Sequence, residues 1–310
     1  MIENVAFVGL PVDEVLKIRK MRVTPEDPGR DSGKRISIVT GVHGDELEGQ
    51  YVCFQVLDRV KRQPEYLTGT VDVYPAMNPL GIESFTRGIP AFDLDMNRLF
   101  PGSQDGAMTE YIASKIVEDL KGSSVCVDIH ASNMFLTEMP QARINENTKK
   151  ELVPLAKFLN LDFLWVHATS TVLESTLAHT MNAFGVPTIV VEMGVGMRIT
   201  KEYGDQLTEG IFCLMKEMGI WSGPVIEPRR PIISEDQKVH FLNAAVSGVF
   251  VQDSAHSSFL KEGDPVGRIV NPLTGDVLDE VTAPADGLLF TIREYPVVDE
   301  GSLLARILEQ

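Results

Sequence analysis

Short runs of apolar, β-branched residues alternate with stretches of helical apolar spacing over roughly the first two thirds of the chain. Runs of the first kind predict buried strands, and apolar residues three and four apart predict amphipathic helices. Strands are expected at residues 36–39, 70–75, 124–129, 163–166 and 187–191, and helices at residues 47–60, 110–120, 144–159, 172–184 and 200–218. This order is typical of an α/β layered domain with a largely parallel sheet flanked by helices.

The two ends of the chain follow other patterns. Residues 1–34 indicate an edge strand or hairpin and then a loop that is dense in proline, glycine and charge. From about Gly223 a proline-rich linker ends the helical periodicity, and a repeat begins. Gly248-Val-Phe-Val leads to KEGDPVGRI, and Gly287-Leu-Leu-Phe leads to DEGSLLARI. Two similar β units predict a small all-β domain over residues 223–310, beside an α/β domain over residues 1–222.

Charge and cysteine content narrow the class of protein. The formal net charge of −16 at pH 7 argues against nucleic acid and anionic membranes as partners. No apolar run is long enough for a membrane span, and the N-terminus has no signal-peptide pattern. Cys53, Cys126 and Cys213 lie far apart in apolar contexts, without a CxxC motif. We therefore expect reduced thiols in a cytoplasmic protein.

Three residues that suit metal binding or proton transfer follow predicted strands. His43, His130 and Glu192 each lie at or just past the C-terminal end of an apolar strand. Open α/β sheets bind ligands at that edge, so these side chains are expected to converge. Glu46 follows His43 by three residues, and such a pair suits a divalent metal at a helix start. Acidic residues also favour first helical turns without a metal, so a capped turn is the alternative.

Two histidines and one carboxylate make a three-ligand site with a position open for water, which is the catalytic zinc pattern. The same donors bind other divalent metals. Asp128, two residues before His130, is either a partner behind the ligands at a bent strand end or a solvated residue.

Residues 79–107 have almost no periodicity, and a loop of this length in a compact domain is usually functional or disordered.

Four separated motifs resemble one known family. They are His43-Gly44-Asp45-Glu46, the segment DLDMNRLFPG at residues 93–102, Asp128-Ile-His130 and Val191-Glu192-Met-Gly194. They look like the succinylglutamate desuccinylase/aspartoacylase family of the zinc carboxypeptidase superfamily, over about residues 35–200 and in the same order. The resemblance implies a zinc carboxypeptidase-like α/β fold with a mixed, largely parallel sheet flanked by helices. It also implies one zinc per chain, held by His43, Glu46 and His130.

The resemblance also implies roles for residues around the metal. Glu192 would be the general base for the attacking water, and Arg87 would polarise the scissile carbonyl. Asn97 and Arg98 would bind a substrate carboxylate, for which a guanidinium fork is suited; a surface ion pair is the alternative for Arg98. Arg143, in a Met-Pro-Gln-Ala-Arg stretch similar to one in bacterial deacylases, is expected either to contact the substrate or to lie at the surface.

The C-terminal repeat and its joint, Ala283-Pro284-Ala285-Asp286-Gly287, resemble a biotinyl/lipoyl-type β fold. Residues 271–280, where such a domain carries its modifiable lysine, contain no lysine. We therefore expect no biotin or lipoate. The predicted role of this domain is to narrow the cleft or to build an interface in a homo-oligomer.

Together these features predict a zinc-dependent amidohydrolase that removes an acyl group, such as acetyl or succinyl, from a small N-acyl amino acid. A metallocarboxypeptidase acting on short peptides would use the same residues in a longer cleft. A non-catalytic binding protein on a hydrolase scaffold is the third hypothesis. The intact set of His43, Glu46, His130 and Glu192 disfavours it, because a degenerate scaffold should have lost at least one of them.

Overall fold

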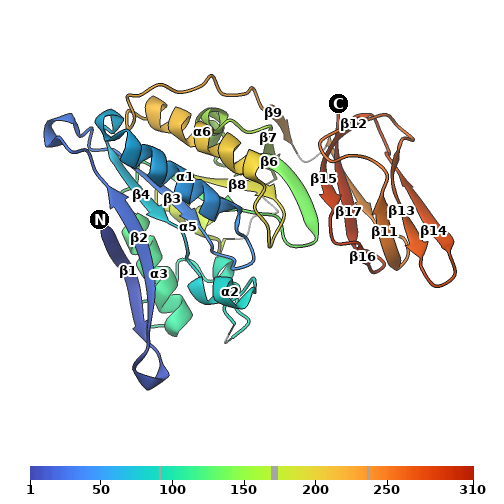
Figure 1. Cartoon of the computed structure of the whole chain (residues 1–310), viewed down its shortest axis with the longest axis horizontal. Coiled ribbons are helices and arrows are strands. Elements are labelled where there is room, and N and C mark those ends of the chain that lie inside the picture. The colour runs from blue at the N-terminus through green and yellow to red at the C-terminus, as the bar shows by residue number, and fades with distance from the viewer. Residues whose placement is uncertain (91, 169–173, 236–237) are drawn as a thin grey trace.

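The computed structural model of the chain describes residues 1–90, 92–168, 174–235 and 238–310 (Figure 1). Within these ranges the chain forms a mixed α/β structure with a large mixed sheet, as the sequence predicts. The helices are α1 (Glu48–Arg62), α2 (Pro79–Ser84), α3 (Met108–Leu120), α4 (Lys149–Ala156), α5 (Leu177–Ala183) and α6 (Lys201–Glu217). None of the described helices is both long and apolar enough to cross a bilayer.

The parallel centre of the large sheet brings the predicted strand ends together. The strands up to residue 235 are β1 (Ile2–Gly9), β2 (Val15–Val23), β3 (Arg35–Thr40), β4 (Thr70–Tyr74), β5 (Val125–His130), β6 (Leu136–Asn145), β7 (Phe163–His167), β8 (Thr188–Gly194) and β9 (Ile232–Glu235). Strands β4, β3, β5 and β8 are neighbours in that order and run parallel. Their register pairs Thr40 with Ile129, and His130 with Glu192. The C-terminal ends of β3, β5 and β8 therefore share one edge.

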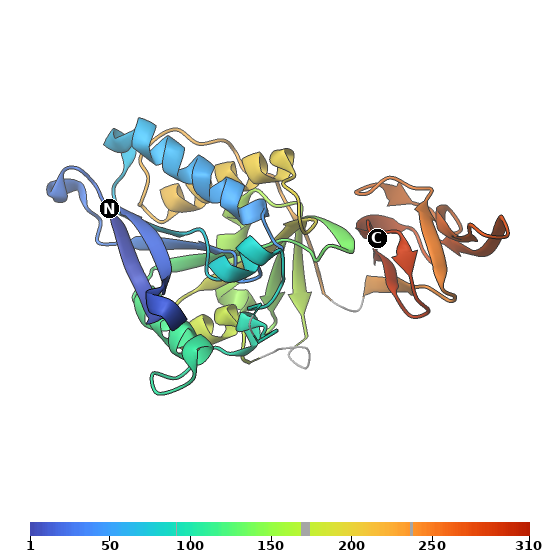
Figure 2. The ribbon, with the colours of Figure 1, turned by 60° about the horizontal axis from the view of Figure 1, so that its bottom comes forward.

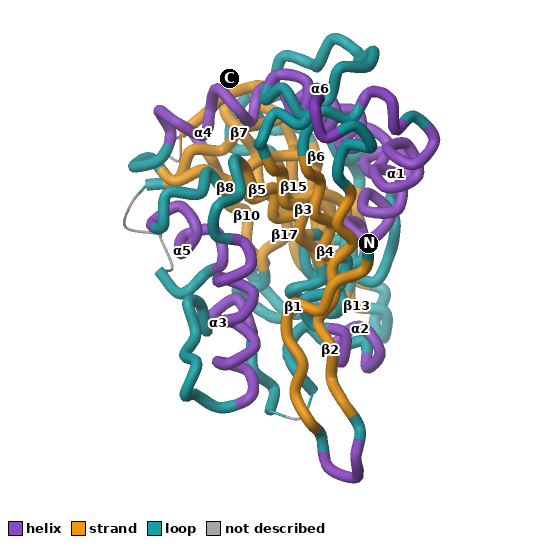
Figure 3. The backbone as a smooth tube through the Cα atoms, turned by 90° about the vertical axis from the view of Figure 1, so that its left-hand side faces the viewer, coloured by secondary structure: helices purple, strands orange, loops and turns teal. Residues whose placement is uncertain are grey.

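Helices cover both faces of this sheet (Figure 3). Side chains alternate between the two faces along a strand. In β3, Ile36 and Ile38 pack in the core under α1 and α6, and Val39 packs in the core under α3 and α5. Burial on both faces explains why the central strands are continuous apolar runs in the sequence.

Strand β6 is the largest difference from the elements expected from the sequence. The pattern predicts a helix over residues 144–159, which is wrong at its start, because Ile144 and Asn145 end β6 and α4 begins at Lys149. Pro140 lies inside β6, where the pairing with β8 shifts register between Glu138 and Gln141. A proline is tolerated at such an irregularity, although it argues against a strand in the sequence. The helix expected over residues 172–184 appears as α5, and residues 172 and 173 lie outside the described ranges.

The C-terminal part of the chain is built of strands, as the repeat predicts, and these strands form two facing layers. They are β10 (Val239–Asn243), β11 (Gly248–Gln252), β12 (Phe259–Leu260), β13 (Pro265–Asn271), β14 (Asp276–Thr282), β15 (Gly287–Arg293), β16 (Val297–Val298) and β17 (Leu303–Glu309). One layer is the separate sheet β14-β13-β11-β16, and the other consists of β12, β15, β17 and β10 of the large sheet. The core between the two layers includes Phe250 and Ile269 from the first and Leu289 and Ile307 from the second. The repeat units exchange short strands, since β11 pairs with β16 and β15 pairs with β12.

Figures 1 and 2 show the C-terminal strands grouped beside the α/β part of the chain. The two parts are nevertheless joined by hydrogen-bonded strands. β15 pairs with β6 through Thr291 and Glu138, and β9 pairs with β7. The large sheet therefore continues from β6 into β15, β17 and β10. The division of the chain into domains at residues 222 and 223 stays a prediction.

Candidate metal centre

The site begins in the turn between β3 and α1. Gly41 has a φ of 68°, which lets the chain turn after β3. Gly44 lies against the backbone of Gly81, where an added Cβ would come within 2.1 Å of a carbonyl carbon. Only glycine allows this close approach, and the contact with Gly81 holds residues 43–46 in one turn ahead of α1. The side chain of Glu46 contacts other parts of the site and makes no cap to α1, which disfavours the capped-turn alternative.

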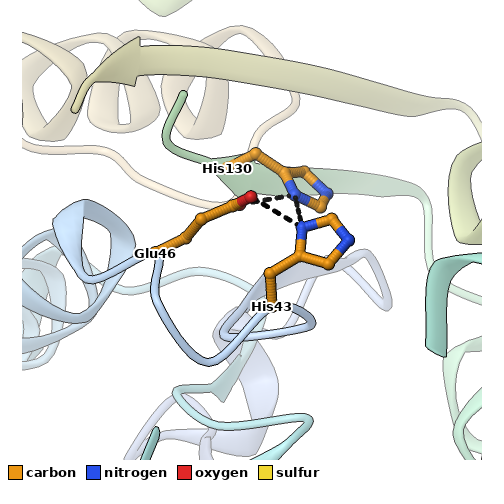
Figure 4. A group of neighbouring side chains, drawn as sticks. All are labelled: His43, Glu46 and His130. Atoms are coloured by element: carbon orange, nitrogen blue, oxygen red, sulfur yellow. Dashed lines mark hydrogen bonds and ion pairs between the residues drawn. The ribbon is translucent and has the colours of Figure 1, made fainter. Parts of the chain in front are cut away.

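His43, Glu46 and His130 form a buried group of three potential ligands (Figure 4). The Nδ1 atoms of the two histidines lie 3.2 Å apart. Oε1 of Glu46 is 2.7 Å from Nδ1 of His43, and Oε2 is 2.9 Å from Nδ1 of His130. The ligand atoms of these three side chains all lie within 4.8 Å of one another. Among the histidine, cysteine and carboxylate side chains that the structure describes, these three form a group that could hold a metal.

These donors fit a divalent metal such as zinc. Zinc binds imidazole nitrogen at about 2.0–2.1 Å, so two tetrahedral ligand atoms lie about 3.3 Å apart. The 3.2 Å between the two Nδ1 atoms matches this spacing. A histidine pair and one carboxylate is also the donor set of catalytic zinc sites, which keep a position for water or substrate.

A carboxylate lies behind each histidine. Nε2 of His130 is 3.3 Å from Oδ1 of Asp128, and Nε2 of His43 is 3.1 Å from Oδ1 of Asp95. Such partners fix the orientation of a metal-binding imidazole and raise its basicity. Asp128 is fully buried, so the alternative of a solvated strand-end residue is wrong.

The Asp128→Asn variant is expected to weaken zinc binding by about 10- to 100-fold, because it removes the charge that orients His130. Competition with a fluorescent chelator measures this affinity. Asp105→Asn, in an exposed loop, is the matched control and should bind zinc like the wild type. An Asp128→Asn variant that folds and binds zinc as tightly as the wild type would remove Asp128 from the site.

The charges of the group perturb its own protonation. Burial alone would lower the pKa of His130, but the carboxylates of Asp128 and Glu46 raise it well above its ordinary value. The pKa of His43 is also raised, since Glu46 and Asp95 outweigh the effect of burial. Burial would raise the pKa of Glu46, yet the charges of the two histidines hold it below its ordinary value. The carboxylate is therefore ionised at neutral pH, and the imidazoles hold their protons more strongly than usual.

Zinc affinity is accordingly expected to rise with pH through and above the ordinary histidine pKa of about 6.5. A metal displaces protons from its ligands, so affinity changes by about tenfold per pH unit for one protonated ring and about a hundredfold for two. Because both histidine pKa values are raised, this slope should persist at pH 7. Affinity measured by chelator competition between pH 6 and 8 tests this, and a flat profile over that range would contradict it.

Glu192 lies on β8 beside this group, in register with His130. Burial raises the pKa of Glu192, and the neighbouring carboxylate of Glu138 raises it further. The guanidinium of Arg143 lowers it, and the resulting pKa is about 7. Nη1 of Arg143 is 3.4 Å from Oε1 of Glu192. A carboxylate whose pKa is close to neutral can both accept and return a proton, as general acid–base chemistry requires.

Arg87, Asn97 and Arg98 line the same cavity. Arg87 donates from Nη1 to Oε1 of Glu46 at 2.9 Å. Oδ1 of Asn97 accepts the N–H of Leu177 at 2.8 Å, which leaves the Nδ2 donors of its amide for another partner. Arg98 donates from Nη1 to the carbonyl of Asn97 at 2.8 Å, and its side chain is 44% exposed.

The cavity has a volume of about 1130 Å³. Its wall includes the three potential ligands, Glu192, Arg143 and Arg306, so a residue from β17 lies in the wall beside residues of the α/β part. His167 and His179 also line it. His167 packs on Trp165, with ring centroids 4.2 Å apart, and lies outside the ligand group.

The sequence motifs do not assign three residues of this site: Asp95, Glu138 and Arg306. Asp95 lies inside the motif at residues 93–102, two residues before Asn97, which is a signal that could have found it. Glu138 accepts hydrogen bonds from Arg143 and Arg306. No local pattern in the sequence marks Glu138 and Arg306 as partners, because 168 residues separate them.

Comparisons with known proteins show which family this chain is similar to. The family model described as the succinylglutamate desuccinylase/aspartoacylase catalytic domain matches residues 32–218, more than half of the chain. An N-alpha-acetyl-L-2,4-diaminobutyric acid deacetylase from Halomonas elongata is 27% identical over 305 aligned positions, which cover 90% of this chain and 83% of that protein.

Solved structures share the fold. The product-bound ectoine utilization protein EutE (DoeB) from Ruegeria pomeroyi has a TM-score of 0.83 at 20% identity, covering 100% of this chain and 95% of that one. A succinylglutamate desuccinylase/aspartoacylase from Rhodobacter sphaeroides has a TM-score of 0.81 at 22% identity, covering 100% and 94%. The similarity extends over both the α/β part and the C-terminal strands.

Proposed function

This chain belongs to the succinylglutamate desuccinylase/aspartoacylase family, and from that premise we propose that it is a zinc-dependent deacylase of a small N-acyl amino acid. The observation that carries the proposal is the buried group of His43, Glu46 and His130 in the wall of a cavity that Glu192 also lines. The relative from Halomonas elongata is named as a deacetylase of an acetylated diamino acid, which supports an amide of this class as substrate.

Each residue has a chemical task in this proposal. Zinc held by His43, Glu46 and His130 would supply a Lewis acid for water and for the scissile carbonyl. Glu192 accepts the proton of the attacking water and returns it to the leaving amine. Arg87, whose Nη1 is 2.9 Å from Oε1 of Glu46, is proposed to stabilise the negative charge that develops on the carbonyl oxygen.

The substrate carboxylate is proposed to bind Asn97 and Arg98. Among the described residues, Nη2 and Nε of Arg98 make no hydrogen bond within the protein, so two donors of the fork remain for a ligand. Asn97 keeps its amide donors in the same wall of the cavity. A fork and an amide side by side suit a carboxylate better than a neutral group.

Arg143 remains a predicted substrate contact, and its observed contacts are with Glu138 and Glu192. The homo-oligomer, the cytoplasmic location and the acyl group also remain predictions from the sequence.

A substrate panel tests the proposed function. Amine release is measured from N-acetyl and N-succinyl amino acids and from short peptides, with purified protein and added zinc. We expect release from a subset of the N-acyl amino acids and none from the peptides. Release from peptides alone would support the carboxypeptidase hypothesis. Release from none of them by zinc-loaded protein would reject hydrolysis of these amides and favour a binding protein.

A further inference from the structure

Glu138 on β6 is a buried carboxylate shared by two arginines. Its side chain is 1% exposed. Nη2 of Arg143 donates to both of its oxygens at 2.8 Å, and Nη1 of Arg306 donates to Oε1 at 2.5 Å. A buried carboxylate is costly unless it is paired and hydrogen-bonded, and this one is satisfied from two directions. The two guanidinium groups leave the cluster with one excess positive charge.

That excess charge lies beside Glu192. Arg143 uses Nη2 for Glu138, and its Nη1 is 3.4 Å from Oε1 of Glu192. Glu138 therefore fixes the guanidinium that contacts the proposed base. Both guanidinium groups also approach the ring of Trp165, at 5.8 Å for Arg143 and 5.5 Å for Arg306. The indole is 3% exposed, and contact with it restricts both groups further.

Strand pairing brings Arg306 to this position from the end of the chain. Thr291 of β15 is in register with Arg306 of β17 on one side and with Glu138 of β6 on the other. Residues in one such row project from the same face of a sheet. Thr291 is small enough for the long arginine side chain to cross it and reach Glu138. The C-terminal strands are thus positioned against the active centre by the register of the sheet.

We infer that Arg306 is a positioning residue of the active centre, which acts through Glu138 and Arg143 on Glu192. The C-terminal strands then contribute a group to the catalytic arrangement, beyond narrowing the cleft. The inference rests on the proposed function, because it takes Glu192 as the base. Arg306 itself contacts Glu138, Trp165 and Phe241, and its task is to keep Arg143 where it holds the Glu192 carboxylate in place.

Steady-state kinetics of Arg306→Met test this inference. Misplacing a catalytic group by about 1 Å costs about 100-fold, so we expect kcat to fall by about 10- to 100-fold while KM stays within about twofold. Zinc content should be unchanged. Arg268→Met, which removes a half-exposed arginine from β13 in the same part of the chain, is the matched control and should leave both constants unchanged.

A double-variant cycle with Glu138→Gln separates positioning from general packing. Because Arg306 acts through Glu138, Arg306→Met should lower kcat in the wild-type background and have little further effect beside Glu138→Gln. Equal losses in both backgrounds would overturn the inference. An unchanged kcat, or a rise in KM alone, would also overturn it. If Arg306→Met does not fold, Arg306→Lys takes its place in the cycle with the same criteria, since an ammonium cannot reproduce the guanidinium contacts.

Fluorine NMR of protein labelled with 5-fluorotryptophan shows that the variants are folded. The chain has two tryptophans. We expect the Trp165 signal to shift in Arg306→Met and the Trp221 signal, from the main core, to stay in place.

The wild-type protein is the reference in the amine-release assay of the variants. No amine release by the wild type would reject the proposed function, whereas release by the wild type and equally by Arg306→Met would reject the role of Arg306 alone.

Discussion

Replacing Glu192 by glutamine is expected to lower kcat by about a thousandfold while the protein keeps its zinc. Glutamine preserves the shape of the side chain and cannot accept the proton of water, and a positioned general base contributes about 100- to 10,000-fold. The ligand group of His43, Glu46 and His130 does not include Glu192, so the metal should remain. Steady-state amine release and elemental analysis of the same preparation measure the two quantities.

Glu174→Gln is the matched control for this variant. Glu174 is exposed and lines the same cavity, so its neutralisation changes the charge of the cavity wall without touching the proposed base. Its kcat should stay within about twofold of the wild type, because the substitution removes no group that is proposed to transfer the proton. A Glu192→Gln variant with near-wild-type kcat would show that another group, or none, acts as the base.

Replacing His130 by alanine is expected to lower zinc affinity by more than about 100-fold and to abolish amine release at limiting zinc. Loss of a carboxylate that hydrogen-bonds a metal ligand already lowers metal affinity by about 10- to 100-fold, and loss of the ligand itself should lower it further. It also leaves Asp128 buried without the imidazole that faces it. Chelator competition measures the affinity.

His179→Ala is the control for His130→Ala. His179 lines the same cavity and lies outside the ligand group, so its removal should leave zinc affinity unchanged. The reverse result, in which His130→Ala binds zinc like the wild type, would mean that the three side chains do not form the site.

The convergence of the candidate site residues at one edge of the sheet could be predicted because they follow buried strands. His43, His130 and Glu192 are separated by long stretches of sequence, and parallel strands bring their C-terminal ends to one edge. The local pattern thus contains the position of each residue in its strand, and the sheet supplies the proximity. The alternatives for Asp128 needed the structure, because strand geometry puts Asp128 and His130 on the same face but does not show whether that end of the strand is buried or solvated.

Strand β6 could not be predicted in the same way. It contains Pro140 and the buried polar residues Glu138 and Gln141, so it does not form an apolar run in the sequence. Glu138 is buried in company with Arg143 and Arg306, which donate hydrogen bonds to it. A hydrophobic pattern does not record such partners. The pairing of β6 with β15 is likewise a choice between distant strands that no local signal specifies.

Zinc titration of chelator-treated wild-type protein tests the central claim most directly. Amine release from an N-acyl amino acid of the active subset is followed as zinc is returned. We expect the rate to rise in proportion to bound zinc and to level off at one zinc per chain, because His43, Glu46 and His130 are proposed to hold one ion. A full rate in chelator-treated protein that contains no metal would contradict it.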